Sequence, residues 1–552
     1  MRGCYESMYR AGGFLVLISS FVVACAGSGS PGTDSGTAIT DAASTADAAP
    51  TTTSVVFTID STSAIHPISR YIYGTNDYTL PAAAKNLTLT RVGGNRLSAY
   101  NWETNASNAG SDWKYSSDNY MSTSSEPALP FKQAAQTASD ASASIILTVQ
   151  AAGWVAADEN GACEPKPTPA QIAQRFLPML PQKGAAFASP PDLTDGKVYA
   201  DELVAYLESQ FPTAQSDPLR RIFYMIDNEP DLWSQTHSEM HPTAPTYAEV
   251  AKVNADFATG IKNVAPSALV FGPVNYGWQG MVNLQNAIDA NGRDFLEFFL
   301  DAMKAAEQTA GKRLLDVLDV HWYPEATGGG KRITDNGVAE DEVQARLQAP
   351  RSLWDSTYTE TSWITQSSTK APIDLIPRLK AKIDQHYPGT KLSISEYNYG
   401  ASNDISGGVA QADVLGTFGR EDVFAATVWM MNSTNTFIYG GFAMYRNYDG
   451  NGATFGDTSV AASTSSVDTS SIYASVSSQD PTKVVAVAIN KAANPISATI
   501  TVNHPTQLAA ADVYVLTSAS AAPAKGAAIT ANGANTFSYT MPARSVSTIS
   551  FR

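Results

Sequence analysis

Cysteine is almost absent from the body of this chain. The 552 residues include three cysteines, of which Cys4 and Cys25 lie near the N-terminus and leave Cys163 alone further along. A single cysteine cannot form an intrachain disulfide, so the fold must depend on its hydrophobic core. The length allows about two to four domains at the usual ~150 residues each, with a core of ample size.

Charged residues are also scarce, at 16% of the chain, against about 25% in an average soluble domain. Among them, 52 Asp and Glu outnumber 36 Lys and Arg, which gives a net charge of −16. Nucleic acid is therefore excluded as the main partner, because binding phosphates needs a basic surface. The 9 Trp and 24 Tyr indicate instead a protein that meets neutral, hydroxyl-rich ligands.

No apolar run in the chain is long enough to span a bilayer comfortably. The run Ala11–Ala24 follows a basic start and ends in small residues, which is typical of a secretion signal. Its end, Val22–Cys25, resembles a bacterial lipobox, in which Cys25 would be lipidated and become the mature N-terminus. An ordinary signal peptide with an incidental cysteine is the alternative.

Residues 26–54 are rich in Ser, Thr and Ala and are predicted to form a flexible tether behind the signal of residues 1–25. We therefore expect a secreted protein that is held at the outer membrane or cell surface of a bacterium. A lipid on Cys25 would be its only contact with a membrane.

Eight short apolar runs alternate with helix-like stretches over residues 71–453. These runs are Tyr71–Gly74, Leu87–Val92, Ser144–Gln150, Ile222–Ile226, Ala268–Val274, Val317–His321, Lys391–Ser395 and Ala425–Met430. Continuous apolar strands between helices predict parallel strands covered on both faces. Eight such units predict a (β/α)8 TIM barrel with long insertions. A doubly wound open sheet is the alternative, but no Gly-rich nucleotide loop follows the first strand.

Residues 454–552 differ from the barrel region, because they are rich in Ser, Thr, Ala and Val and contain short alternating strands without helical periodicity. This pattern predicts a C-terminal antiparallel β-sandwich. Val55–Asp60, in the segment 55–70 before the barrel, is predicted to add a strand to the same sandwich.

Two glutamates stand where barrel strands end. Glu229 follows the fourth apolar run and Glu396 ends the seventh. The C-terminal ends of barrel strands converge on one mouth, so these two carboxylates can flank a substrate. Such a pair is what glycosidic cleavage needs, since one carboxyl group protonates the leaving oxygen and the other attacks or activates water. Taken singly, each glutamate could equally be a solvated residue at a strand end.

Several segments together resemble glycoside hydrolase family 44. They are Thr90–Arg96, Tyr100–Trp113, Asn228–Trp233, His321–Pro324, Ser395–Asn398 and Asn447–Gly450. The resemblance covers about Val55 to Arg552. It implies a barrel fused to a β-sandwich and an endo-β-1,4-glucanase, often with xyloglucanase activity.

The resemblance also implies roles for individual residues. Glu229 would be the general acid/base and Glu396 the nucleophile of a retaining double displacement, with their carboxyls about 5–5.5 Å apart. Arg91 is our candidate for the cation that keeps Glu396 ionised, although it could be a surface arginine at a loop start. The remaining expected substrate-site residues are Asn228, beside the scissile bond, His321, and Tyr323 as a hydrogen-bond donor to the nucleophile.

Tryptophans at strand ends are candidates for stacking on the apolar faces of sugar rings. Trp233 and Trp429 lie nearest the predicted mouth, although a buried core position is an equally common place for tryptophan.

An acidic cluster around residues 192–202 could bind calcium through carboxylate oxygens. Family members carry a structural calcium near this region, and the resemblance suggests Glu103, Asp195 and Asp201 as ligands. The alternative is an acidic turn whose charges favour a helix N-terminus. No cofactor is expected for catalysis, and His237-Ser-Glu-Met-His241 is interpreted as a loop because a zinc motif needs Glu directly after the first His.

We therefore predict a secreted, monomeric enzyme that hydrolyses β-1,4-linked polysaccharides such as cellulose and xyloglucan. Two alternatives remain open. The same barrel and glutamates could act on xylan or mannan, or the chain could be a non-catalytic glycan-binding lipoprotein.

Overall fold

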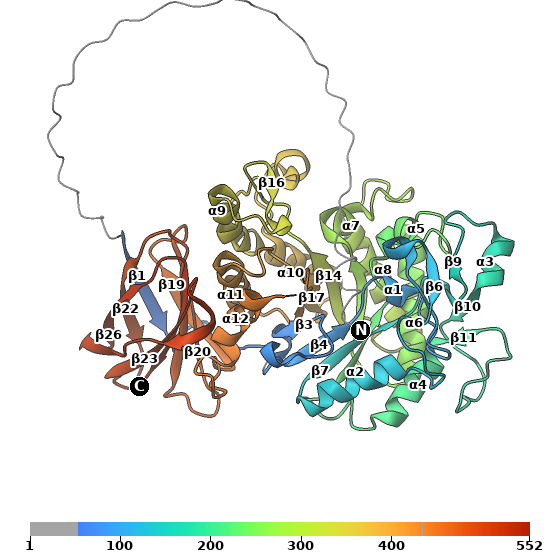
Figure 1. Cartoon of the computed structure of the whole chain (residues 1–552), viewed down its shortest axis with the longest axis horizontal. Coiled ribbons are helices and arrows are strands. Elements are labelled where there is room, and N and C mark those ends of the chain that lie inside the picture. The colour runs from blue at the N-terminus through green and yellow to red at the C-terminus, as the bar shows by residue number, and fades with distance from the viewer. Residues whose placement is uncertain (1–52, 85, 433) are drawn as a thin grey trace, which may run out of the picture.

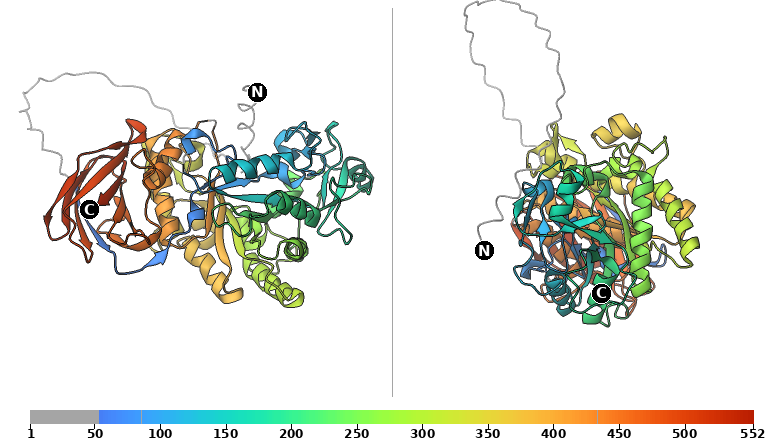
Figure 2. Two further views of the ribbon diagram at one scale, coloured as in Figure 1. Left: turned by 90° about the horizontal axis from the view of Figure 1, so that it is seen from below. Right: turned by 90° about the vertical axis from the view of Figure 1, so that its right-hand side faces the viewer.

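The computed structural model describes residues 53–552, with residues 85 and 433 left out. The predicted signal, the lipidation residue Cys25 and most of the tether lie outside the described residues. The described chain forms a barrel and a strand domain at one end of it (Figures 1 and 2). In the part that the structure describes, no helix is both long and apolar enough to cross a membrane.

Eight parallel strands close into a barrel, as the sequence predicted, and β7 pairs with β12 to complete the ring. In chain order these strands are β3 (Gly74–Thr75), β4 (Leu89–Val92), β7 (Ser144–Val149), β12 (Ile222–Ile226), β13 (Val270–Asn275), β14 (Val317–Trp322), β17 (Lys391–Tyr397) and β18 (Ala425–Val428). Closure excludes the doubly wound open sheet. Every residue of β7, β12, β13 and β14 is buried, which explains why these strands appear in the sequence as continuous apolar runs.

Helices cover the barrel and fill its loops. They are α1 (Asn95–Ser98), α2 (Leu129–Asp140), α3 (Pro169–Arg175), α4 (Ala200–Gln210), α5 (Trp233–Thr236), α6 (Tyr247–Val264), α7 (Gly277–Asn283), α8 (Phe295–Ala310), α9 (Glu340–Gln348), α10 (Leu375–His386), α11 (Ile405–Arg420) and α12 (Thr436–Arg446). Local sequence sets their ends. In α6, for example, Thr246 and Glu249 cap each other's backbone N–H groups.

Short strands lie in the loops between these elements. They are β5 (Ser107–Asn108), β6 (Ser116–Asp118), β8 (Trp154–Ala156), β9 (Gly161–Ala162), β10 (Phe176–Leu180), β11 (Val198–Tyr199), β15 (Thr327–Gly328) and β16 (Lys331–Arg332).

The strand domain combines the first two described strands with the C-terminal segment from β19 onward. Its strands are β1 (Thr53–Asp60), β2 (His66–Pro67), β19 (Thr458–Thr464), β20 (Ser470–Val476), β21 (Val484–Asn490), β22 (Ile496–Asn503), β23 (Ala510–Thr517), β24 (Ser520–Lys525), β25 (Ile529–Gly533), β26 (Thr536–Met541) and β27 (Ser545–Phe551). In Figure 1, β1 is the blue strand among the red ones.

The pairing in this domain is mostly antiparallel, with one departure from the prediction. β1 is antiparallel to β19 but runs parallel to β22, with Val55 opposite Ala498. Val55, Phe57 and Ile59 are buried and alternate with exposed residues, so one face of β1 joins the core of the domain. A strand inserted between two neighbours that run in opposite directions must be parallel to one of them.

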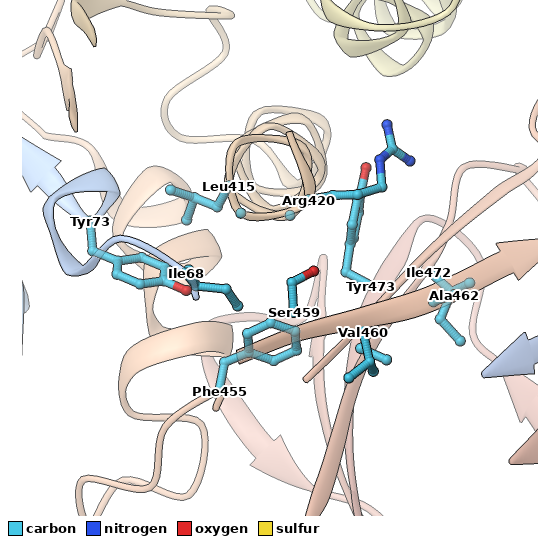
Figure 3. Close-up of a pocket in the computed structure, with 13 residues that line it drawn as sticks. Ile68, Tyr73, Leu415, Arg420, Phe455, Ser459, Val460, Ala462, Ile472 and Tyr473 are labelled. Atoms are coloured by element: carbon cyan, nitrogen blue, oxygen red, sulfur yellow. The ribbon is translucent and has the colours of Figure 1, made fainter. Parts of the chain in front are cut away.

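Helix α11 joins the barrel to the strand domain. On this helix, Asp413 pairs with Lys491 at 2.8 Å and accepts a hydrogen bond of 2.7 Å from the Tyr473 hydroxyl, with all three side chains buried. Gly416 lies against the Tyr473 ring so closely that an added Cβ would stand 2.1 Å from Cδ2. A cavity of only about 10 Å³ remains between α11 and strands β19 and β20 (Figure 3), so the two parts pack as one body.

Candidate active site

The two predicted glutamates meet at the mouth of the barrel. Glu229 follows β12 by three residues, and Glu396 lies near the C-terminal end of β17. Both side chains are largely buried, with Glu229 8% and Glu396 5% exposed. The backbone of Glu229 is left-handed, at φ 43° and ψ 59°, and its N–H donates to the Val274 carbonyl at 3.0 Å. Such a conformation is costly for a residue other than glycine, so the surrounding bonds must hold the turn.

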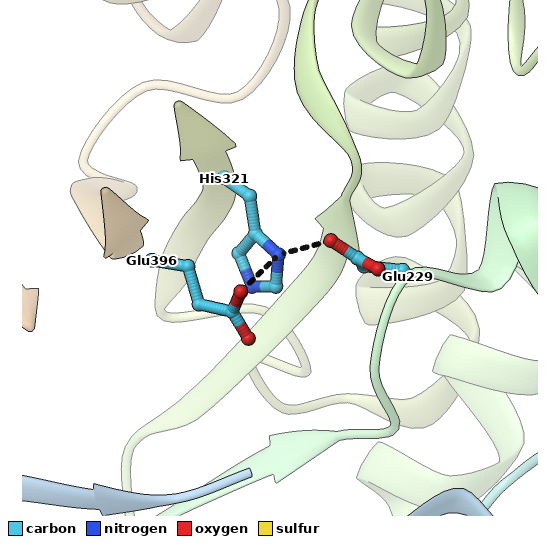
Figure 4. A group of neighbouring side chains, drawn as sticks. All are labelled: Glu229, His321 and Glu396. Carbon is cyan, nitrogen blue, oxygen red and sulfur yellow. Dashed lines mark hydrogen bonds and ion pairs between the residues drawn. The ribbon is translucent and has the colours of Figure 1, made fainter. Parts of the chain in front are cut away.

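His321, on β14, stands between the two carboxylates (Figure 4). Its Nδ1 lies 2.8 Å from Oε1 of Glu229 and 3.5 Å from Oε2 of Glu396. One polar atom from each of the three side chains lies within 4.8 Å of the others. This spacing resembles the short separation of retaining glycosidases rather than the roughly 6.5–9.5 Å that leaves room for a water molecule in inverting ones.

Glu396 is surrounded by donors that favour its charged form. Arg91 donates to Oε1 at 2.5 Å, and the Tyr323 hydroxyl donates to Oε2 at 2.8 Å. Burial alone would raise the pKa of Glu396, but His321, Arg91 and the Tyr323 hydrogen bond outweigh it and lower the pKa below its usual value. Glu396 is thus ionised at neutral pH.

Glu229 has the opposite electrostatic environment. Burial raises its pKa well above the usual value, and the nearby charge of Glu396 raises it further. Glu229 therefore keeps a proton while its neighbour is ionised. Two adjacent carboxyl groups with opposed pKa shifts are the arrangement that separates a proton donor from a nucleophile.

Arg91 also fixes the groups around the pair. The guanidinium is fully buried and donates to Asn228 at 2.7 Å and to Asn76 at 3.0 Å. The structure thus brings Arg91, Asn228, His321 and Tyr323 to the two glutamates. Sequence reasoning missed Asn76, although its place just after β3, at the mouth of the barrel, was a usable signal.

Comparison with known proteins identifies the family. The model of glycoside hydrolase family 44 matches residues 106–326, the segment that contains Glu229 and His321. Endoglucanase A of Paenibacillus lautus is 40% identical over 507 residues, which make up 88% of this chain and 71% of that protein. The chain belongs to glycoside hydrolase family 44.

Solved structures agree with this assignment. A xyloglucanase of Paenibacillus polymyxa from family 44, solved with xyloglucan, has a TM-score of 0.85 and 38% identity, and the match covers 90% of this chain and 99% of that one. CelM2, a bifunctional glucanase-xylanase from a metagenome library, has a TM-score of 0.77 and 33% identity, with coverage of 90% and 99%. The resemblance seen in the sequence is confirmed, and the chain is a glycoside hydrolase.

One of the two predicted sugar platforms of this family 44 chain has a different place. Trp233 is 1% exposed, its indole N–H donates to Asp227 at 3.1 Å and its ring packs on His241. The prediction that Trp233 stacks on substrate is therefore wrong, because the ring has no open face. It supports the turn that carries Glu229.

Asp227 anchors that turn and was missed as a functional residue. Its Oδ1 accepts from the Ser98 hydroxyl at 2.5 Å as well as from Trp233, and its Oδ2 accepts from the N–H groups of Ala151 and Ala152 at 2.5 and 2.9 Å. A buried acid directly before the Asn-Glu pair was the available signal.

Trp429 is partly exposed at the end of β18, and its ring lies over Gly94, where an added Cβ would stand 2.8 Å from Cη2. A cavity of about 130 Å³ is lined by Tyr276, Tyr323 and the exposed Trp363, among others. Because the Tyr323 hydroxyl donates to Glu396, this aromatic-lined cavity adjoins the site of the glutamates.

The acidic cluster fits a cation only in part. Glu103 and Glu202 are buried, and Oε1 of Glu103 and Oε2 of Glu202 have no hydrogen-bond partner. Burial, followed by the charges of Glu202 and Asp195, raises the pKa of Glu103 to about 8. Two unsatisfied buried carboxylate oxygens, one of them on Glu103 with its raised pKa, call for either a proton or a cation beside them.

The expected ligand set needs one correction. Both oxygens of Asp201 accept the Lys183 backbone N–H at 3.0 Å, so Asp201 is already used in holding a loop. Glu202, the next residue, carries the unsatisfied oxygen, although its Oε1 pairs with Lys183 Nζ at 2.6 Å. Asp195 is exposed. Across residues 53–552, apart from the two left out, these acids do not converge into a three-ligand group.

Proposed function

We propose that this glycoside hydrolase is a secreted, retaining endo-β-1,4-glucanase that acts on xyloglucan and cellulose-type β-glucans. The observation that carries the mechanism is the Glu229–His321–Glu396 group. Its two carboxyl groups lie on either side of one imidazole, and their pKa values are shifted in opposite directions. The substrate class is supported by the two Paenibacillus relatives, which are named as an endoglucanase and a xyloglucanase.

In the first step, the ionised Glu396 attacks the anomeric carbon of the sugar. The bond from that carbon to the glycosidic oxygen breaks, and the leaving oxygen takes the proton of Glu229. This produces a glycosyl ester on Glu396 and an ionised Glu229. Arg91 and Tyr323 hold the attacking carboxylate through separate oxygens, which orients it before substrate arrives.

In the second step, water attacks the same carbon while Glu229 takes its proton. The ester bond to Glu396 breaks, and both carboxyl groups return to their starting states. Two inversions at one carbon leave the sugar with its original β configuration. Asn228, held by Arg91, points toward the same site and is assigned to the sugar beside the scissile bond.

The test is hydrolysis by the full chain of carboxymethyl-cellulose, tamarind xyloglucan, xylan and mannan, measured as released reducing sugar. Glu229→Gln and Glu396→Gln should each lower turnover by about 10²–10⁴-fold or more, whereas the exposed Glu164→Gln should change nothing. NMR of the first product should show the β anomer. An initial α anomer would refute the double displacement.

Xylan is the best-supported alternative substrate. The match to the glucanase-xylanase CelM2 covers 99% of that chain, so the part of CelM2 that resembles this protein is nearly the whole enzyme. If reducing sugar is released from xylan or mannan only, and both glutamate variants lose this activity, the proposed mechanism stands. The proposed substrate would then be wrong. No release from any polymer by folded protein would favour the glycan-binding alternative.

We infer that Cys25 is the lipidated N-terminus of a monomer anchored at the bacterial surface. Support comes from the sequence pattern alone, since this segment lies outside the described residues. Incorporation of labelled palmitate in a bacterial host should be lost in Cys25→Ser. The variant protein should instead be secreted free of the membrane. Labelling that survives the substitution would exclude this anchor.

We also infer a structural calcium between Glu103 and Glu202. The support is their two unsatisfied buried oxygens and the raised pKa of Glu103. Hard carboxylate oxygens are the ligands that calcium prefers. The ion would hold the loop around Lys183 and take no part in the reaction.

A further inference from the structure

His237 follows the turn that carries Glu229, and the mechanism above gives it no role. It comes directly after α5, where its backbone N–H donates to the Trp233 carbonyl at 2.8 Å. In the sequence it belongs to a histidine pair without a zinc motif. The side chain of His237 is 0% exposed, and so is that of Glu239 two residues later. A buried histidine beside a buried acid, so close to the general acid, needs an explanation.

Both ring nitrogens of His237 contact oxygen atoms. Nδ1 lies 2.8 Å from Oε1 of Glu239, and Nε2 lies 2.7 Å from the carbonyl oxygen of Asn95. A carbonyl oxygen can only accept, so Nε2 must carry a proton. Burial lowers the pKa of His237, but the charge of Glu239 and the hydrogen bonds to Glu239 and Asn95 outweigh burial and raise the pKa above its usual value. Glu239 thus favours an imidazolium that donates from both nitrogens.

Asn95 connects this histidine to the active site. Its Nδ2 donates to Oδ1 of Asp112 at 3.0 Å, and its Oδ1 accepts from Nδ2 of Asn228 at 3.3 Å. On the other side, Oδ1 of Asn228 accepts from Arg91 at 2.7 Å. An arginine can only donate and a carboxylate can only accept, so the two ends of this chain fix the orientation of both amides. One N–H of Asn228 is directed to Asn95, and the other can donate to a sugar.

Packing holds His237 in the same place. Gly110 begins the 3-10 helix Gly110–Trp113, which carries Asp112. A Cβ added to Gly110 would stand 2.8 Å from Cε1 of His237 and 2.2 Å from the Thr236 carbonyl oxygen. The imidazole therefore packs on the backbone of Gly110 while it donates to the backbone of Asn95. Both segments that hold the amide chain are placed against one ring.

We propose that His237 is a positioning residue whose Nε2–H fixes the backbone of Asn95, so that the Asn95 side chain directs the Asn228 amide to the sugar beside the scissile bond. Glu239 holds the ring from Nδ1. Hydrogen bonds to the reacting sugar strengthen in the transition state of glycosidases, so a misdirected Asn228 amide slows the reaction. This inference rests on the proposed contact between Asn228 and the sugar.

Two substitutions separate the two contacts of His237. The amide of asparagine takes the place of Nδ1, whereas the longer glutamine brings its amide to the place of Nε2. His237→Asn therefore keeps a donor for Glu239 and loses the bond to Asn95. His237→Gln keeps a donor for Asn95 and leaves Glu239 without its partner. His66→Asn is the matched control, because His66 lies on β2 of the strand domain and also bonds through both nitrogens, to the carbonyls of Ala64 and Gly419 at 3.1 Å.

The variants are compared by thermal melts and by kcat/KM on whichever polymer the parent hydrolyses. His237→Asn should lose about tenfold or more in kcat/KM, because displacing a group by about 1 Å can cost ~10²-fold. His237→Gln should stay within about threefold of the parent but melt at a lower temperature than His237→Asn, because it leaves a buried acid unpaired. His66→Asn should keep the kcat/KM of the parent. A merely structural role would rank the two His237 variants in the same order by activity and by stability, and that result would overturn the proposal.

A double-mutant cycle tests whether His237 acts through Asn228. In an Asn228→Ala background, His237→Asn should cost less than about twofold, because residues that act through one another are not additive. A full tenfold loss in that background would show that His237 acts by another route and would overturn the proposal.

Asn228→Ala also separates this inference from the proposed function. If Asn228→Ala hydrolyses polymer as fast as the parent, the proposed sugar contact of Asn228 fails, and this inference fails with it. If Asn228→Ala is impaired and His237→Asn is not, the sugar contact stands and only the role of His237 fails.

The proton on Nε2 can also be observed directly. The chain has six histidines, so ¹⁵N-histidine labelling gives a small set of long-range ¹H–¹⁵N signals, and His237→Gln assigns one of them. We expect Nε2 of His237 to be protonated in the parent. A bare Nε2 would overturn the proposal, because it could not donate to the Asn95 carbonyl.

Discussion

Arg91 and Glu396 form a buried ion pair at 2.5 Å, with side chains that are 0% and 7% exposed. They come from strands on different sides of the barrel mouth, β4 and β17. Because the pair is buried, losing either partner would leave the other as an uncompensated charge.

Removing the charge of Arg91 should therefore impair the nucleophile. In Arg91→Met, the pKa of Glu396 rises because a cation that lowered it is gone. The acidic limb of the pH–kcat/KM profile should move to higher pH, and kcat/KM should fall by about 10²–10³-fold. Arg96→Met, which breaks the neighbouring pair with Asp118, is the control and should leave the limb in place. An unmoved limb in Arg91→Met would contradict this electrostatic role.

The two tryptophans should respond differently to substitution. Trp429→Ala removes a partly exposed ring at the mouth, so KM for polymer should rise about 3–10-fold, as expected for the loss of ~0.5–1.5 kcal/mol of stacking. Trp233→Phe removes the donor to Asp227 and should lower the free energy of unfolding by about 1 kcal/mol. Initial rates and thermal melts of both variants check this. A raised KM without lost stability in Trp233→Phe would restore it as a sugar platform.

Two glycines of α11 offer a matched test of the packing against the strand domain. Gly416→Ala places a Cβ 2.1 Å from the Tyr473 ring, whereas Gly419→Ala places one at an ordinary 3.5 Å from Ile68. We expect Gly416→Ala to destabilise the protein by about 1–3 kcal/mol. Gly419→Ala should gain up to about 1 kcal/mol of helix propensity. Denaturant titration measures both, and equal effects would mean that the domains are not tightly packed there.

Calcium should raise the melting temperature of the parent relative to a chelator, because a ligand bound only to the native state stabilises it by about 2.7 kcal/mol at 100 times its Kd. Glu103→Gln and Glu202→Gln should lose this response, and the exposed Glu159→Gln should keep it. Identical melts with calcium and with chelator would indicate that Glu103 is protonated instead.

The parts predicted well from sequence share one property, which is that a local pattern fixes them. The eight apolar runs predict the barrel because a strand buried on both faces needs apolar side chains at every position, as in β7 and β12. Glu229 and Glu396 could be placed together because strand ends in a closed barrel converge.

The parts predicted poorly depend on orientation rather than pattern. Trp233 and Trp429 both follow a strand end, and only the packed structure shows that one ring is covered. Asp201 and Glu202 are neighbours on one helix, about 100° apart around its axis. A one-residue difference therefore decides which carboxylate has both of its oxygens bonded to the backbone. The parallel pairing of β1 with β22 likewise depends on long-range topology that no local spacing contains.

The pairing of β1 has a consequence for the order in which the molecule is made. β1 emerges from the ribosome before the barrel, yet its partner β22 follows the barrel, and Ser61 bonds to Asn503 across 442 residues. Closing so long a loop costs little more than closing a shorter one, since the entropy grows only with the logarithm of length. The timing is what changes. The barrel is synthesised while β1, a strand of the other domain, still lacks its partner β22, and the chain is fastened at both ends only when synthesis is nearly complete.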